Sequence, residues 1–154
     1  MSLRQQGFTI VELITVMVVI GILSAVAIPM MTGNSMAGPA FRNELASTLR
    51  YAQKTAVSHR RLVCATVSAT TVTLSIASAA GSTVCNTTLA SPDGNSVTSK
   101  DSAVTASGAL VGILYFQPVG TITTNNAGTV TAAGTISVTG QAGIAIQGAT
   151  GYVE

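Results

Sequence analysis

The first part of the chain is a long run of apolar positions. Residues 8–31 contain a single charge, Glu12, and only a short polar leader with Arg4 precedes them. At about 1.5 Å per residue, a helix of this length reaches across the hydrocarbon core of a bilayer. A carboxylate near the start of such a helix is costly in lipid and by default marks a functional position. The pattern predicts a membrane-spanning helix over residues 8–31.

A cluster of Gly, Asn, Ser and Pro interrupts the helical pattern between Gly33 and Pro39. Proline disfavours the helical conformation at the residue before it, here Gly38, so we expect a break or kink. Residues 32–39 are therefore predicted to be a hinge between the apolar helix and a domain over residues 40–154.

From Pro39 to about His59 the apolar positions recur at three- and four-residue steps, which indicates an amphipathic helix. Its apolar stripe consists of Phe41, Leu45, Leu49, Ala52 and Ala56. Basic residues lie on a different arc and at the C-terminal end: Arg42, Arg50, Lys54, Arg60 and Arg61. We expect the apolar stripe to pack against a sheet.

Beyond Leu62 the pattern changes to alternating β-branched residues, with Gly, Asn or Pro between the runs. The predicted strands are Leu62–Val67, Thr71–Ser78, Val97–Ser99, Ala109–Phe116, Gly120–Thr123, Gly128–Thr131, Thr135–Thr139, Gly143–Gln147 and Tyr152–Val153. Many short strands with regular turn signals are typical of antiparallel sheets, either two packed ones or sharply bent ones. The expected fold class is α+β.

Charge is sparse in this chain of 154 residues, with seven Lys or Arg and five Asp or Glu. Such a small net charge predicts no partner. Small side chains dominate the second half, which suits thin, tightly packed β-structure better than a deep ligand pocket. His59 is the only histidine, and no Ser-His-Asp, Cys-His or phosphate-loop pattern is present. We therefore expect no enzymatic activity, no cofactor and no metal site.

The leader lacks the order of a secretory signal, in which the cleavage site follows the apolar region. Here the plausible cut, between Gly7 and Phe8, lies before it. Arg4 would keep the start of the chain in the cytoplasm and send the remainder across the membrane. The sequence Gly-Phe-Thr-Ile-Val-Glu-Leu that starts at Gly7, with its apolar run and Pro29, resembles the class III signal of type IV pilins and type II secretion pseudopilins. The alternative is a plain single-pass anchor.

This resemblance implies that prepilin peptidase cuts after Gly7 and methylates the amino group of Phe8. Glu12 lies four residues after Phe8 and so shares a helix face with it. In pilins this glutamate instead pairs with the terminal amine of a neighbouring subunit and sets the register of assembly. A lone unpaired charge in a low-dielectric bundle costs several kcal/mol, so such a pair disfavours misalignment. Gly21 and Pro29 are weak points where the helix could bend or melt locally in a filament. For Gly21 the alternative is a glycine that a membrane helix simply tolerates.

Three further blocks are similar to the GspH/FimT family of minor pilins and pseudopilins: the helix from Arg42 to Val63, Phe116–Gly120 and Gly134–Gly140. The resemblance implies a pilin-like α+β fold, with a long hydrophobic helix and then a helix packed on antiparallel β-sheets in a sandwich-like head. It implies a minor type IV pilin of the FimT or FimU type that helps initiate or cap a pilus and contributes to DNA uptake. The alternatives are a GspH-type pseudopilin of type II secretion and a direct DNA receptor on a competence pilus.

The basic residues supply the candidate DNA-binding set, which consists of Arg42, Arg50, Lys54, Arg60, Arg61 and Lys100. Lys and Arg bind phosphates without reading sequence, with an affinity that falls as salt rises. In the family, however, DNA binding is associated with an arginine-bearing C-terminal tail, and this chain has no basic residue after Lys100. The alternative is that the cluster solvates the helix or contacts acidic neighbouring subunits.

Export would place the head in the periplasm, with a single pass through the bacterial inner membrane before incorporation into a pilus or pseudopilus. The expected partners are other pilins, prepilin peptidase, the inner membrane and DNA of any sequence. In an oxidising periplasm the two cysteines, Cys64 and Cys85, are expected to form a disulfide, which would contribute roughly 3 kcal/mol. The alternative is two buried thiols.

Overall fold

The computed structural model describes residues 9–32, 36–92, 94 and 96–154, and the side chains of all of these but 26–32. The chain divides into two units, residues 1–35 and residues 36–154, which are taken in turn. The second unit is called the head below.

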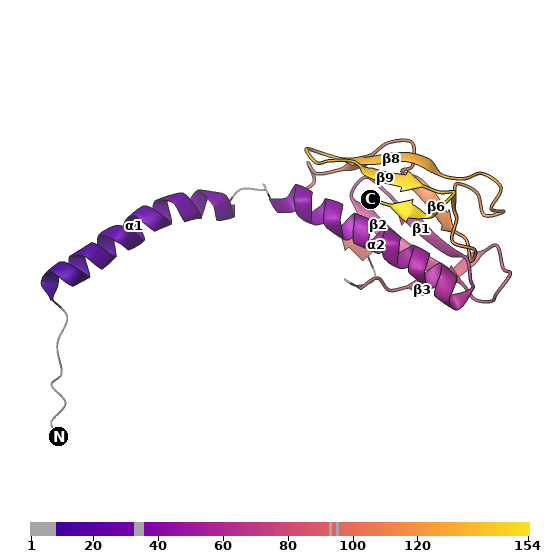
Figure 1. The fold of residues 1–154 in the computed structure, drawn as a ribbon, viewed down its shortest axis with the longest axis horizontal. Helices are drawn as coiled ribbons and strands as arrows, with labels where there is room; N and C mark the ends of the chain where they lie inside the picture. Colours follow the sequence, from indigo (N-terminus) through magenta and orange to yellow (C-terminus); the bar gives the residue numbers. More distant parts are fainter. Residues whose placement is uncertain (1–8, 33–35, 93, 95) are drawn as a thin grey trace, which may run out of the picture. The chain divides into compact units, whose positions relative to one another are not determined.

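In the first unit, α1 runs from Ile10 to Thr32 and is continuous across Gly21 and Pro29 (Figure 1). Its described large apolar side chains are all exposed in the single chain, from 51 % for Val16 to 79 % for Ile10. Within the described residues, no helix combines the length and the apolar character needed to cross a membrane. The spanning helix predicted over residues 8–31 is therefore not confirmed.

The head begins with α2, Ala37–His59 (Figure 1). The predicted hinge over 32–39 extends too far, because Gly38 and Pro39 belong to the first turn of this helix. A proline is tolerated there, since the N–H groups of the first turn have no intrahelical acceptor and the missing donor costs nothing. The compact unit accordingly starts at Met36 rather than at residue 40.

Ten strands follow, all paired antiparallel within two sheets. Their bounds are β1 Val63–Val67, β2 Thr71–Ala77, β3 Cys85–Leu89, β4 Ser96–Thr98, β5 Ala106–Ser107, β6 Gly112–Phe116, β7 Ile122–Thr123, β8 Ala133–Val138, β9 Ile144–Gln147 and β10 Tyr152–Val153. The larger sheet has the order β3-β2-β1-β6-β7, with β4 also paired to β2, and the smaller one the order β10-β9-β8-β5. The head is thus a helix on antiparallel sheets, which confirms the expected α+β class.

Three details of the strand prediction are wrong: one predicted strand is not formed, and β3 and β5 have no predicted counterpart. Gly128–Thr131 is no strand and makes only an isolated bridge between Thr131 and Thr123. The backbone N–H groups of Thr129 and Val130 donate instead to the Asn125 side chain, each at 3.1 Å. Strand β3 was not predicted, because its residues are mostly polar and exposed and lack the alternation that marks a half-buried strand.

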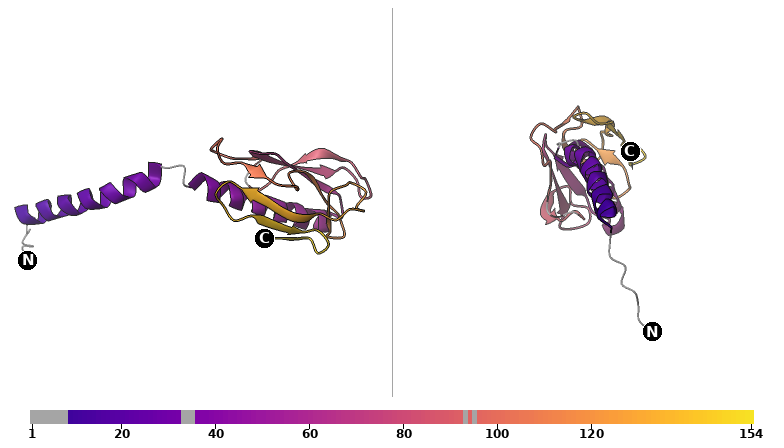
Figure 2. Two further views of the ribbon diagram at one scale, coloured as in Figure 1. Left: turned by 90° about the horizontal axis from the view of Figure 1, so that it is seen from above. Right: turned by 90° about the vertical axis from the view of Figure 1, so that its left-hand side faces the viewer.

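The predicted apolar stripe of α2 forms the centre of the head core. Each of its five residues is at most 1 % exposed. The helix contacts strands β1, β2, β4 and β6 of the larger sheet and strands β8 and β10 of the smaller one (Figure 2). Helix and sheets bury one continuous cluster that includes Leu45, Phe116 and Ile136. The head therefore carries its own hydrophobic core, independent of the first unit.

Strand β7 joins the two sheets through backbone hydrogen bonds. The Ile122 N–H donates to the Gly148 carbonyl at 2.8 Å, and the Ala132 N–H donates to the Ile122 carbonyl at 2.9 Å. A Cβ atom at Gly148 would lie 2.2 Å from the Ile122 carbonyl oxygen, a contact that no side chain permits. Glycine is required there because three backbone segments meet at one point.

Candidate functional site

The start of α1 carries the residues that the sequence assigns to processing and assembly. Gly7 and Phe8 lie outside the described residues. Glu12 lies in the first turn, and its backbone N–H donates to the Thr9 side-chain hydroxyl at 3.2 Å. Thr9 therefore caps the helix, and its spacing from Glu12 is that of a capping box. Sequence reasoning missed this cap, although Thr-x-x-Glu before an apolar run is its known signal.

The other hydroxyl groups described in α1 are used within the helix. Thr15 donates to the Glu12 carbonyl at 2.9 Å, and Ser24 donates to the Ile20 carbonyl at 2.7 Å. Because these polar groups are satisfied locally, the described surface of α1 is apolar on every side, with the Glu12 carboxylate as its one charge. A helix that is apolar on all sides is typically buried, either in lipid or among other helices.

The basic residues of α2 do not form one free patch. Arg42 donates from Nε to the Ala142 carbonyl at 2.9 Å, in the turn between β8 and β9. Arg50 donates from Nε to the Val153 carbonyl in β10, also at 2.9 Å. Both guanidinium groups thus tie the helix to the smaller sheet. Arg60 ends α2 in the left-handed conformation, with φ at 52°, and Lys100 lies in the segment after β4.

Two of the candidate residues, Arg50 and Lys54, line a common hollow. This basic groove has a volume of about 460 Å³ and lies between α2 and the segment from Gln147 to Val153. Tyr152, 51 % exposed, lines it as well, and no carboxylate does. The groove offers two cations and an aromatic ring, which fits an anion with an attached ring or chain. Sequence reasoning missed Tyr152 because it was assigned only to a short strand.

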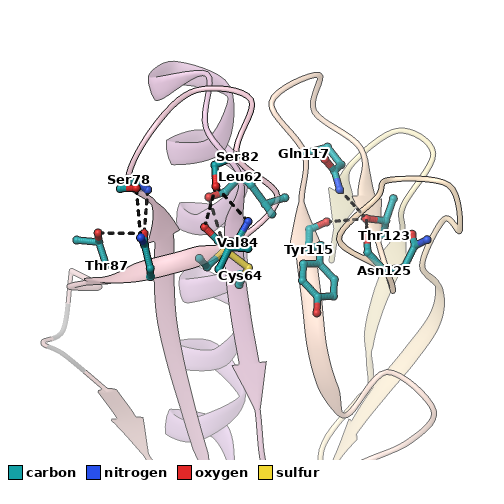
Figure 3. The surroundings of a disulfide bond; sticks show 12 residues. Leu62, Cys64, Ser78, Ser82, Val84, Thr87, Tyr115, Gln117, Thr123 and Asn125 are labelled. Carbon is teal, nitrogen blue, oxygen red and sulfur yellow. Dashed lines mark hydrogen bonds between the residues drawn. A yellow bond between two sulfur atoms is a disulfide. The ribbon is translucent and has the colours of Figure 1, made fainter.

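The two cysteines form the expected disulfide, with 6.1 Å between the Cα atoms of Cys64 and Cys85 (Figure 3). Cys64 is in β1 and Cys85 starts β3, while β2 pairs with both of these strands. The bridge therefore crosses β2 and ties the end of the loop between β2 and β3 to β1. It packs beside Leu62, Ala77 and Tyr115 in a second, smaller apolar cluster.

Comparison with known families adds one match. Residues 2–28 match the family described as the prokaryotic N-terminal methylation motif, a range that contains Gly7, Phe8 and Glu12. This motif is typical of type IV pilins and pseudopilins, which are structural proteins processed by prepilin peptidase and assembled with other pilins. No curated protein and no solved structure matches the chain. The narrower resemblance to the GspH/FimT family stays a prediction.

Proposed function

We propose that this chain is a minor type IV pilin, cut between Gly7 and Phe8 and methylated at Phe8. In this proposal α1 holds it in the bacterial inner membrane, with the head in the periplasm, until it joins other pilins and helps initiate or cap a filament. One observation carries the proposal: the methylation motif at residues 2–28 covers most of α1, a helix whose described large apolar side chains are all exposed.

The energetics of α1 support assembly through this helix. Burial of one large apolar side chain contributes about 1.5–3 kcal/mol, so packing of α1 among similar helices gives a strong but non-directional attraction. Direction requires another group, and Glu12 is the one charge on the described part of α1. A carboxylate that finds the terminal amine of a neighbour is stabilised, whereas one left unpaired in an apolar bundle costs several kcal/mol. Glu12 thus sets the register.

The cleavage assignment is tested by replacing Gly7 with Leu and measuring the mass of the chain in membranes that contain prepilin peptidase. We expect uncut precursor, because the bulky side chain blocks the position before the cut. The matched control is Gly21→Leu, which lies inside α1 where an added Cβ meets no atom within 4 Å. Normal processing of Gly7→Leu would contradict the class III assignment.

The register role of Glu12 is tested with Glu12→Ala. The variant should be inserted and cleaved normally but enter filaments at least about tenfold less, which corresponds to about 1.4 kcal/mol of lost pairing. Glu44→Ala, which removes a carboxylate from α2, is the control and should assemble normally. Equal incorporation of Glu12→Ala and the unsubstituted chain, counted in purified filaments, would reject the charge pair.

A second function, sequence-independent DNA binding during uptake, is favoured by the basic groove. Arg50 and Lys54 are placed to contact phosphates, and the exposed ring of Tyr152 offers a surface on which a base stacks. The competing interpretation is that these cations solvate α2 or contact acidic neighbouring subunits. The two differ in whether the isolated pilin binds DNA.

Binding of a short single-stranded DNA to the full chain in detergent should weaken steeply as salt rises. Lys54→Ala removes a phosphate contact and should weaken it about threefold to tenfold. Tyr152→Ala should weaken it at least about fivefold, since stacking is worth about 1–3 kcal/mol per base. Lys100→Ala removes the same charge outside the groove and should have little effect. A loss as large with Lys100→Ala as with Lys54→Ala would indicate only diffuse charge attraction and reject the groove.

The remaining alternative is a GspH-type pseudopilin, whose partners belong to a type II secretion system. Deletion of the chain separates the two assignments. Loss of surface pili with normal enzyme secretion supports the minor pilin, and the opposite phenotype supports the pseudopilin. The number of copies per purified filament distinguishes a minor from a major subunit.

A further inference from the structure

A second hollow lies on the face of the larger sheet that points away from α2. Its volume is about 320 Å³, within the usual range of small-molecule pockets. Side chains alternate between the two faces of a strand, so Val63 and Ala65 of β1 enter the core while Cys64 and Thr66 face this hollow. Ser75 of β2 and Tyr115 of β6 are the direct cross-strand partners of Cys64 and extend the same face. We call it the outer hollow.

Two loops raise the rim of the outer hollow, and internal bonds hold each of them. The loop between β2 and β3 contributes Thr83 and Val84; the disulfide fixes it, and the Val84 N–H donates to the Ser82 hydroxyl at 3.2 Å (Figure 3). The loop after β7 contributes Asn126, next to Asn125, whose amide bonds three groups of residues 129 and 130. The hollow is thus preformed, which lowers the entropy cost of binding.

The lining combines free polar groups with exposed apolar ones. Five of its residues carry a hydroxyl or amide that makes no hydrogen bond to another described residue: Thr66, Ser75, Thr83, Tyr115 and Asn126. Beside them, Val84 is 60 % and Ile113 is 48 % exposed. No Asp, Glu, Lys, Arg or His lines the hollow. The disulfide packs against Tyr115 and supports its side chain.

These features select a class of ligand. A charged ligand would find no counter-charge in the outer hollow and would lose part of its hydration without compensation. A purely apolar ligand would leave the five polar groups without partners, at a cost of about 1–3 kcal/mol for each group it desolvates. A ligand that alternates hydroxyl groups with C–H faces satisfies both kinds of surface, and a sugar ring has this composition.

We propose that the outer hollow binds a neutral carbohydrate. A sugar unit lies with a C–H face toward the side chains of Tyr115 and Ile113 and exchanges hydrogen bonds with Thr66, Ser75 and Asn126. Thr83 and Val84, on the loop held by the disulfide, close one side of the site. The assignment rests on the lining alone and stands whether the filament is a pilus or a pseudopilus.

The test uses the full chain in lauryldimethylamine oxide, a detergent without sugar, titrated with maltose, lactose and chitobiose and followed by isothermal calorimetry. At least one disaccharide should bind saturably, with a dissociation constant on the order of 1 mM. Tyr115→Ala and Asn126→Ala should each weaken binding at least about tenfold. Tyr115→Phe keeps the ring and should lose about threefold, which separates loss of the hydroxyl from misfolding.

Two matched comparisons sharpen the result. Val84→Ala should weaken binding, whereas Val119→Ala truncates an 83 % exposed valine outside the hollow and should not. Replacement of both Cys64 and Cys85 by Ser should weaken binding at least about tenfold, because the rim loop is released. Glucose, titrated in the same way, distinguishes two kinds of natural ligand. A higher affinity for maltose than for glucose indicates a glycan chain, and equal affinity indicates a free sugar; both results support the proposal.

Three outcomes would overturn it. The first is the absence of saturable binding for all three disaccharides. The second is unchanged affinity in Tyr115→Ala. The third is equal binding of a sulfated disaccharide, which would show that neutrality is not selected. If Tyr115→Ala and Val84→Ala instead lower incorporation into filaments with no sugar bound by the parent chain, the hollow is a contact between subunits and the proposal fails.

Discussion

The helices α1 and α2 have the same length, 23 residues, but they differ in how their apolar residues are distributed around the helix axis. In α2 the apolar residues follow one stripe, and the protein's own sheets bury all of it. In α1 apolar residues occupy nearly every position, and the large ones that the structure describes are all exposed. Apolar content alone therefore does not decide what a helix packs against. The spacing of the apolar residues does, because a stripe can be covered by the sheets of the same domain while an all-round apolar surface requires lipid or several helical neighbours.

This difference predicts different effects for substitutions in the two helices. Substitutions in the stripe of α2 act on the stability of the head, because they remove contacts that exist in one subunit. If α1 assembles with other pilins as proposed, substitutions on α1 should act on association, because the contacts that they remove would exist only in an assembly. The following predictions test that division, in order of decreasing effect.

The largest effect is expected for Leu45→Ala, which empties a fully buried position of the α2 stripe. It should lower the free energy of unfolding of the head by about 2–5 kcal/mol, as measured by chemical denaturation of the full chain. Val18→Ala also shortens an aliphatic side chain, on α1, where Val18 is 55 % exposed. It should leave head unfolding unchanged and reduce only filament incorporation. A similar loss in head stability for both variants would contradict the division.

Removal of the disulfide comes next. The double variant Cys64→Ala and Cys85→Ala opens a loop with a sequence separation of 21 and should destabilise the head by roughly 3 kcal/mol. Denaturation of the parent chain under reducing conditions should give the same midpoint as the double variant. Hydrogen exchange of the α1 amides, followed in both chains, should not differ.

A smaller effect is expected for Arg50→Ala. It removes the hydrogen bond to the Val153 carbonyl and should lower head stability by about 1–2 kcal/mol, read from the denaturation midpoint. Lys54→Ala, one turn further along α2, removes a charge that makes no hydrogen bond to another described residue. Its effect should stay within about 0.5 kcal/mol. Equal losses would show that the Arg50 contact contributes only through charge.

The smallest effect is expected at the start of α1, for Thr9→Ala. Loss of the cap should destabilise the first turn by about 1 kcal/mol and speed hydrogen exchange at Val11, Glu12 and Leu13. Thr15→Ala, whose hydroxyl bonds only the carbonyl three residues earlier, is the control. Slower or unchanged exchange in Thr9→Ala would show that Thr9 does not hold the first turn.

Much of the fold follows from periodicity. The α2 stripe and strands such as β1 and β9 combine a clear spacing with burial, so pattern and structure coincide. Pattern reasoning failed where side chains replace the backbone ladder, as at Asn125, or where an exposed polar segment still pairs at a sheet edge, as in β3. It also extended the hinge through Pro39, since the rule that proline ends a helix does not apply in a first turn.

The candidate sites were less predictable for a different reason. The leader motif is contiguous in sequence, so Glu12 and the processing residues could be found without a structure. The basic groove joins α2 to β10, and the outer hollow joins four strands and two loops. Residues such as Tyr152 and Asn126 are unremarkable in sequence and acquire a role only through neighbours that are distant along the chain. The spacing of residues within one segment cannot predict contacts between segments that are distant in sequence.

The bond from Arg50 to Val153 spans 103 positions and joins the first element of the head to its last. Because α2 precedes β10 by nine strands in the sequence, Arg50 is synthesised well before the carbonyl group that accepts its hydrogen bond. A chain terminated a few residues early lacks both this acceptor and the pairing of Glu154 with Ala145. A chain shortened by a few residues should therefore have a less stable head, in which α2 is held less firmly to the smaller sheet.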